Sequence, residues 1–210
     1  MRSLTTKNLF DMKVKKIIQI DNEILQTAIG NAEAKGVWLV YGSEKNGKTS
    51  FVLQLAKALC KRQKVAYISA EEGTDLSFTE AVKRAGLTTA DKIAWYTYMS
   101  LADVVKKFTK AKSADVIILD NATMYADEFR DMNIKELENK LPGKLIILLS
   151  HEERKEPHPA AAKNAKKMAK VYFNVKGLSA FGVSRFSGVS TQININETKA
   201  TLYWGDEIQQ

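Results

Sequence analysis

The sequence contains few of the residues that build disulfide-rich or zinc-binding proteins. It has one cysteine, Cys60, and two histidines in 210 residues, which excludes an intramolecular disulfide and a cysteine-rich zinc site. We expect Cys60 to pack as a small apolar side chain rather than to act as a nucleophile. Proline is also rare, and two of the three prolines fall between residues 151 and 167.

Long apolar runs are absent as well. No segment approaches the roughly 20 apolar residues of a membrane-spanning helix, and residues 1–7 lack the apolar core of a signal peptide. We therefore expect a cytoplasmic protein without membrane contact. With 45% hydrophobic and 27% charged residues, a chain of this length can bury one good core.

Positive charge exceeds negative charge. The formal net charge is +8 and the isoelectric point is about 9.4. An excess of lysine and arginine favours a polyanionic partner such as nucleic acid, because neutralising phosphates releases counterions. Solvated surface lysines without any partner are the alternative explanation.

A phosphate-binding loop is the clearest motif in the chain. The apolar run 37–40 predicts a buried strand before it, and apolar residues at helical spacing between 51 and 59 predict a helix after it. In that setting backbone N–H groups converge on the phosphates, Lys48 reaches the β- and γ-phosphates and the Thr49 hydroxyl ligates Mg²⁺. A glycine turn with a surface lysine would not explain this context. The residues expected to hold the nucleotide are Gly42, Ser43, Glu44, Lys45, Asn46, Gly47, Lys48, Thr49 and Ser50.

Buried strands alternate with helical patterns along the middle of the chain. The expected strands are 37–40, 65–69, 93–98, 116–119 and 145–149, and this alternation predicts an α/β fold with a mostly parallel sheet flanked by helices. We expect residues 1–34 to form a basic, partly helical lead-in, with a basic stretch at 13–16, and residues 35–210 to form the core domain.

The pattern changes after residue 150. Residues 151–167 are polar and predict a long loop that leads into a short helix. Beyond them, alternating segments predict strands at 171–175, 181–184, 193–196 and 200–204, with tight connections at 176–177 and 196–199. We therefore expect antiparallel hairpins at the C-terminal end of the sheet.

Three polar positions directly follow expected parallel strands. Asp120 ends the strand that begins at 116, where an α/β sheet binds ligands, and we expect it to complete the Mg²⁺ site. Glu71 and Glu72 follow the strand 65–69 and are candidates to activate water. Ser150 and His151 follow the strand 145–149 and are candidates to hydrogen-bond the γ-phosphate. The alternatives are a helix cap for Asp120, ordinary loop acids and a solvated histidine.

These motifs together resemble the RecA-like P-loop ATPases, a group that includes bacterial recombinases, RadA-type repair proteins, KaiC-like proteins and hexameric replicative helicase motors. The matching segments are Gly42–Thr49, Tyr67–Glu72, Ile117–Asp120 and Leu148–His151. The resemblance covers about residues 35–205 and is strong in the RadA-type stretch Tyr67–Leu87. One departure is that the glycine-rich stretch that precedes the phosphate loop of filament-forming recombinases is missing between Ile20 and Gly36.

The resemblance implies roles for further residues. It implies that Glu71 is the catalytic glutamate, with Glu72 as the neighbouring alternative, and that the loop after residue 150 faces DNA. It also implies a nucleotide placed between subunits, with a basic residue from the neighbour; Arg185 is the candidate, and Lys176 and Lys199 compete with it. A solvated amphipathic helix is the alternative for the lysines after residue 160. The expected DNA-binding residues are Arg154, Lys155, Lys163, Lys166 and Lys167.

The sequence thus predicts a homo-oligomeric, Mg²⁺-dependent ATPase that acts on DNA in recombination, repair or replication. ATP and Mg²⁺ are the expected cofactors, and Lys48, Glu71, His151 and Arg185 the expected catalytic residues. Three alternatives stay open: a helicase motor or helicase loader, a nucleotide-gated assembly protein without DNA, and a small-molecule kinase.

Overall fold

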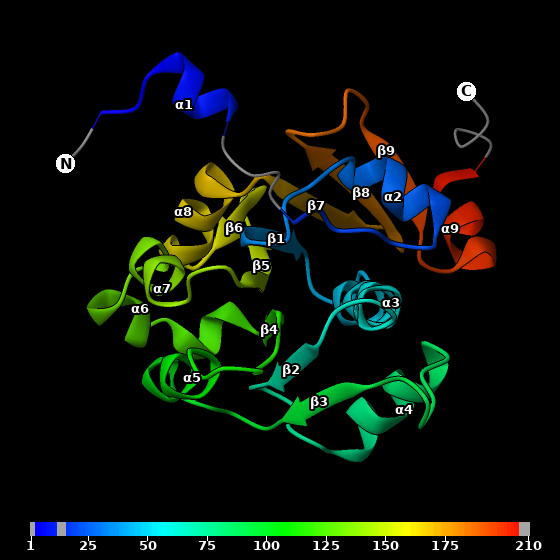
Figure 1. Cartoon of the computed structure of the whole chain (residues 1–210). Coiled ribbons are helices and arrows are strands. Elements are labelled where there is room, and N and C mark those ends of the chain that lie inside the picture. The colour runs from blue at the N-terminus through cyan, green and yellow to red at the C-terminus, as the bar shows by residue number, and fades with distance from the viewer. Residues whose placement is uncertain (1–2, 12–15, 206–210) are drawn as a thin grey trace.

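The computed structural model describes residues 3–11 and 16–205, and within them nine strands form one mostly parallel sheet between two layers of helices (Figure 1). Residues 13–15 of the predicted basic stretch lie outside the described part. The strands are β1 (Gly36–Gly42), β2 (Val65–Ser69), β3 (Ile93–Tyr96), β4 (Val116–Asp120), β5 (Leu145–Glu153), β6 (Glu156–His158), β7 (Val171–Lys176), β8 (Ser179–Ser184) and β9 (Thr191–Asn194).

Helices follow nearly every strand of the parallel part. They are α1 (Thr6–Phe10), α2 (Glu23–Ile29), α3 (Lys48–Cys60), α4 (Leu76–Arg84), α5 (Leu101–Phe108), the 3-10 helix η1 (Ala122–Tyr125), α6 (Glu128–Asp131), α7 (Ile134–Lys140), α8 (Ala160–Met168) and α9 (Glu197–Trp204). The strand order is β3-β2-β4-β5-β1-β7-β8-β9, with β6 paired to the end of β5. The predicted fold class, including the antiparallel hairpins at the C-terminal side, is confirmed.

Each face of the sheet carries its own hydrophobic core. Because side chains alternate along a strand, Trp38 and Val40 of β1 join the cluster that includes α2 and α3. Val37, Leu39 and Tyr41 join the cluster under α5, α7 and α8. The central strands are apolar on both faces, as parallel strands between two helical layers must be.

The segment before β1 is built into the first of these cores. Ile18, Ala28 and Ile29 are fully buried in the same cluster as Phe51 of α3 and Phe173 of β7. The predicted boundary between residues 34 and 35 stays a prediction, but the packing ties residues 18–34 to the sheet that follows.

The predicted strand at 200–204 is wrong. Residues 197–204 form helix α9, and the predicted tight connection at 196–199 is its first turn. Asn196 caps this helix, since its Oδ1 accepts a hydrogen bond from the Lys199 N–H at 3.0 Å. Thr201, Leu202 and Tyr203 have the residue types of a strand, but the cap and the buried Ala200 decide the local structure.

The predicted long loop after residue 150 is also partly wrong. Strand β5 continues to Glu153 and turns back into β6, so residues 151–158 form a β-hairpin. Arg154 and Lys155 make its two-residue turn with φ of 51° and 66°, as a type I′ turn requires of its central residues. Helix α8 then follows, in agreement with the predicted short helix.

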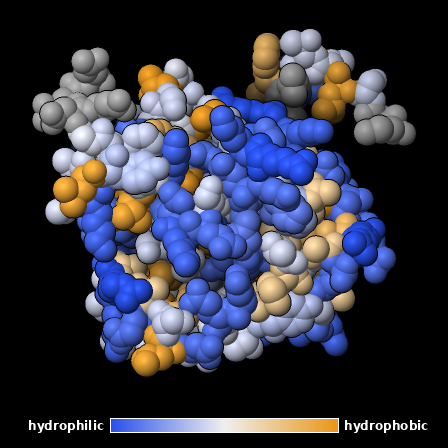
Figure 2. Space-filling model, turned by 180° about the vertical axis from the view of Figure 1, so that it is seen from behind, coloured by the Kyte–Doolittle hydropathy of each residue, from blue (hydrophilic) through white to orange (hydrophobic). Residues whose placement is uncertain are grey.

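None of the helices in the described ranges is both long enough and apolar enough to cross a membrane. From behind the view of Figure 1, the molecule presents a largely hydrophilic face with hydrophobic side chains in scattered spots (Figure 2).

Gly30 and Gly205 provide a matched test of backbone packing. Both end a helix in the same glycine-specific conformation, with φ and ψ of 60° and −148° at Gly30 and 60° and −147° at Gly205. A Cβ on Gly30 would lie 2.2 Å from the Phe186 carbonyl oxygen, whereas a Cβ on Gly205 would meet nothing within 4 Å. We expect Gly30→Ala to lower the free energy of unfolding by about 2–5 kcal/mol, from backbone strain plus overpacking.

Gly205→Ala introduces the same backbone strain but no steric clash. We therefore expect it to lower the free energy of unfolding by no more than about 1–3 kcal/mol. Urea denaturation followed by circular dichroism measures both variants. Equal losses of unfolding free energy in the two variants would show that the loop around Phe186 can move away without cost, so that its close approach to Gly30 is unimportant.

Candidate functional site

Most of the residues predicted to bind the nucleotide and act on it meet at one edge of the sheet. Strands β1, β2, β4 and β5 are parallel, and their register sets Gly42 beside His151 and Ser69 beside Asp120. A cavity of about 550 Å³ lies at these strand ends. Its lining consists of Glu44, Lys45, Gly47, Lys48, Thr49, Ser50, Glu71, Glu72, Asp120, Asn121, Leu149, Ser150, His151 and Leu178.

The loop between β1 and α3 presents unpaired backbone donors. Within the described part of the chain, the N–H groups of residues 44–50 donate to no protein acceptor. Gly47 has a φ of 95°, which lets the loop turn directly into the N-terminus of α3. A run of N–H groups at a helix N-terminus binds phosphate, so this loop fits the nucleotide that the sequence predicts.

The far side of the loop is anchored to the C-terminal hairpin. The Asn46 side chain accepts a hydrogen bond from the Gly177 N–H at 2.8 Å and donates one to the Glu44 carbonyl at 3.0 Å. Leu178 packs so closely on Gly47 that a Cβ there would lie 2.8 Å from its Cδ2. The turn between β7 and β8 therefore supports the phosphate loop from outside.

Lys48 lies over the loop at the entrance to α3. Its Nζ donates to the Ser43 carbonyl at 2.9 Å. Burial lowers the pKa of this half-buried amine, and the carboxylates of Asp120, Glu44 and Glu71 act against that shift. A phosphate group would replace the single carbonyl contact with a charge-assisted one.

Asp120 is held by a tyrosine that sequence reasoning missed. The Tyr67 hydroxyl donates to Asp120 Oδ2 at 2.6 Å. Burial raises the pKa of Asp120 to about 6; the Tyr67 hydrogen bond opposes this, and the carboxylates of Glu72 and Glu71 add to it. Burial also raises the pKa of Tyr67 well above its ordinary value, so the phenol stays a donor.

Thr49 and Asp120 fit the expected Mg²⁺ ion. Both line the same cavity, and Mg²⁺ is usually bound by one or two protein oxygens together with substrate phosphates and water. A bound cation would also stabilise the ionised form of Asp120, which burial disfavours.

Asn121 contacts two of the predicted catalytic residues, Glu71 and His151. Its Nδ2 donates to Glu71 Oε2 at 2.8 Å and lies 2.7 Å from His151 Nε2. Its Oδ1 accepts from the Thr123 N–H at 3.1 Å, which fixes the orientation of the amide. The only sequence signal for Asn121 is its place directly after Asp120.

The surroundings of His151 favour its neutral form. Burial, followed by the charge of Lys48, lowers the pKa of His151. Since Asn121 donates to Nε2, the ring proton is assigned to Nδ1. Nδ1 is buried and has no hydrogen-bond partner among the described residues.

The two glutamates after β2 are distinguished by their partners. Both line the cavity, but Glu71 contacts Asn121, whereas Glu72 accepts a hydrogen bond from Ser77 at the start of α4, at 3.1 Å. The connection of Glu71 to Asn121 and His151 favours Glu71 as the residue that acts in the cavity.

The remaining predicted residues do not line the cavity. Arg154 and Lys155 are exposed at the hairpin turn, and Lys163 and Lys167 are exposed on α8. Lys166 is engaged, because its Nζ lies 3.4 Å from Glu156 and 4.9 Å from the centre of the Tyr41 ring.

Arg185 follows β8 at the opposite edge of the sheet, where its side chain donates to the Lys167 carbonyl at 3.2 Å. It therefore does not contribute to the site of its own chain. The competing candidate Lys176 lies 5.4 Å above the Trp204 ring.

Comparison with known proteins places this geometry in a fold group. No protein-family model matches the sequence, and no curated protein matches it. Among solved structures, the flagellar accessory protein FlaH from Methanocaldococcus jannaschii is 17% identical, with a TM-score of 0.60 over 86% of this chain and 93% of that one. The KaiC-like protein PH0186 from Pyrococcus horikoshii is 15% identical, with a TM-score of 0.62 over 84% and 91%. The chain therefore has the RecA-like fold that its motifs predict.

Proposed function

We propose that the protein binds and hydrolyses ATP in a Mg²⁺-dependent reaction. The observation that carries this proposal is the cavity in which the unpaired N–H groups of residues 44–50 and Lys48 share one space with the Glu71–Asn121–His151 contacts. Phosphoryl transfer to water requires groups that bind and neutralise the phosphates and a group that orients the attacking water.

Each residue has a distinct part in the proposed reaction. The loop amides and Lys48 bind the phosphates and stabilise the charge that develops on the γ-phosphoryl group. The Thr49 hydroxyl and the Asp120 carboxylate hold Mg²⁺, which neutralises charge on the phosphate oxygens when it is bound. Glu71 orients the attacking water, and Asn121 holds Glu71. His151, which lines the same cavity, is the candidate to hydrogen-bond the γ-phosphate.

We further propose that the ATPase is cytoplasmic, acts on DNA and works as a homo-oligomer, with residues 35–210 as the ATPase core. The net charge of +8 supports a nucleic-acid partner. The exposed Arg154, Lys155, Lys163 and Lys167 are candidates for contact with it. The position of Arg185 away from the site of its own chain supports a role in the site of a neighbouring copy.

A nucleotide-gated assembly protein is the second candidate. The Asn46–Gly177 hydrogen bond favours it, since it connects the phosphate loop directly to the C-terminal hairpin, and Gly177 in turn packs on Tyr203 of α9. ATPase assays with and without DNA separate the two functions. Stimulation by DNA supports the first, and binding of ATP without any turnover supports the second.

Lys48→Ala tests the phosphate loop. The variant loses a charge-assisted contact to the phosphates, so we expect ATP affinity to fall by about 10- to 100-fold, with the melting temperature nearly unchanged. Isothermal titration calorimetry and a steady-state ATPase assay measure both effects. Unchanged turnover in the pure variant would contradict the assignment of this loop.

Glu71→Gln and Glu72→Gln form a matched pair. We expect Glu71→Gln to keep ATP binding and to reduce kcat by about 10²- to 10⁴-fold, as loss of a residue that activates water does. Glu72→Gln, whose partner is Ser77, should leave kcat within a few-fold of the wild type. The reverse ranking would transfer the role to Glu72.

Asn121→Ala tests the positioning of Glu71. Without the amide, Glu71 and His151 lose their common partner, and we expect kcat to fall by about 10- to 100-fold while the Kd for ATP changes little. Thr123→Ala is the control, because it keeps the Thr123 N–H that orients the amide. An effect on Kd alone would show that Asn121 only supports nucleotide binding.

A further inference from the structure

Lysine stands directly before most strands of the parallel part of the sheet. The five positions, here named the lysine row, are Lys35 before β1, Lys64 before β2, Lys92 before β3, Lys144 before β5 and Lys170 before β7. Only β4 differs, with Asp115 in this position. Parallel strands start at the same edge of a sheet, so these residues gather at the edge opposite the nucleotide cavity.

The strand register sets four of these lysines nearly level. Gly36 pairs with Leu145, and Val65 pairs with both Ile93 and Val116, so the residues before them are neighbours along the edge. Lys170 is slightly displaced, since its N–H donates to the Val37 carbonyl. With strands about 4.8 Å apart, the row from β3 to β7 extends over about 24 Å.

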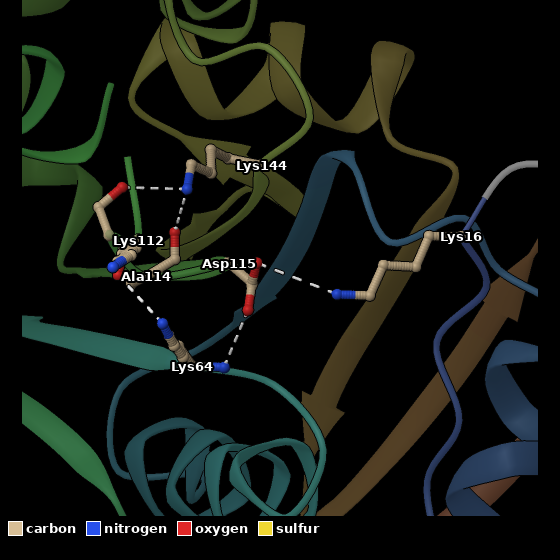
Figure 3. A network of polar contacts seen from close by, with 7 residues as sticks. Lys16, Lys64, Lys112, Ala114, Asp115 and Lys144 are labelled. Atoms are coloured by element: carbon tan, nitrogen blue, oxygen red, sulfur yellow. Dashed lines mark hydrogen bonds and ion pairs between the residues drawn. The ribbon is translucent and has the colours of Figure 1, made fainter. Parts of the chain in front are cut away.

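The charges of the row are mostly not cancelled by carboxylates. Figure 3 shows Lys64 and Lys144 around Asp115: the Lys64 amine donates to the Lys112 carbonyl at 3.2 Å, and the Lys144 amine to the Ala114 carbonyl at 2.7 Å. Asp115 is 4.0 Å from the Lys16 amine instead. Among the described residues, Lys35, Lys64, Lys92 and Lys144 have no carboxylate within 4.0 Å, whereas Lys170 pairs with Glu33.

The negative ends of the neighbouring helices and the nearby carboxylates do not fully neutralise the positive charge of the lysine row. The C-terminal ends of α3, α4, α5, α7 and α8 lie at the same edge, and each contributes about half a negative charge, or about −2.5 in total. Four carboxylates lie there as well, those of Glu33, Asp91, Asp115 and Glu138. The five lysines of the row, together with Lys16, Lys112 and Arg185, exceed this sum and leave a small positive surplus.

We propose that the lysine row binds the phosphate backbone of nucleic acid without reading its sequence. A line of amines suits a linear polyanion, because lysine contacts to phosphates neutralise charge and release counterions. Stable protein interfaces are depleted in lysine, which makes a protein partner a poorer match. The surface is separate from the ATP site, so the proposal holds whether or not ATP is hydrolysed.

The segment predicted to contact DNA has a different charge balance. In the β5–β6 hairpin, Arg154 and Lys155 stand among Glu152, Glu153 and Glu156, and Glu156 also pairs with Lys166. Carboxylates at these positions repel phosphates. The edge with the lysine row therefore fits nucleic acid better than the hairpin does.

Two triple variants that remove the same charge decide between these surfaces. The first combines Lys35→Gln, Lys64→Gln and Lys92→Gln; the second combines Arg154→Gln, Lys155→Gln and Lys163→Gln. Fluorescence anisotropy with labelled single- and double-stranded DNA, at a series of salt concentrations without nucleotide, measures affinity and its salt dependence. Circular dichroism confirms that both variants are folded, and flotation with phosphatidylserine vesicles tests a lipid surface.

We expect the first variant to bind DNA at least about tenfold more weakly and to lower the slope of log affinity against log salt by about 2–3 on duplex DNA. The second variant should change both quantities little. A larger loss in the second variant, equal losses in both, or no DNA binding by the wild type would overturn the proposal. So would binding to the vesicles that is tighter than binding to DNA at equal phosphate concentration. Loss of ATPase activity in Lys48→Ala with DNA binding intact would leave it standing.

Discussion

The parallel pairing of β1 between β5 and β7 is the constraint on which the site depends. It brings the end of β1 beside His151 on one side and beside β7 on the other. The approach to β7 is so close that a Cβ on Gly42 would lie 2.1 Å from the Val175 carbonyl oxygen. The first glycine of the phosphate loop is therefore required by strand packing as well as by phosphate chemistry. A larger residue there would displace the strand that carries the loop.

The parts of the site that the sequence predicts are those that depend on strand ends. Lys48, Glu71, Asp120 and His151 each directly follow a recognisable buried strand or belong to the loop motif, and parallel pairing alone brings them together. Asn121 could not be identified in this way, because its role depends on the direction of one amide. Tyr67 could not be identified from the sequence either. It lies inside a strand and has the residue type of a core position, and only the direction of its hydroxyl group brings it into contact with Asp120.

The errors at the C-terminal end have a common physical origin. Short segments with β-branched and aromatic residues satisfy the pattern of a strand, but a strand also needs a partner with free backbone groups. Residues 200–204 instead follow the Asn196 cap and pack Ala200 inward as a helix. The reverse error affects residues 151–158. The prolines between residues 151 and 167 suggested a loop, but the short strand β6, which includes Pro157, finds a partner in β5.

The hydrogen bond between Asn46 and the Gly177 N–H has a consequence for how tightly a ligand can be held. A glycine-containing loop is ordinarily costly to order, since its backbone loses much conformational freedom. Here the β7–β8 turn restrains the outer flank of the loop before any ligand arrives. Part of the conformational entropy of the loop is therefore lost when the protein folds rather than when the ligand binds. More of the interaction energy between loop and ligand then contributes to affinity.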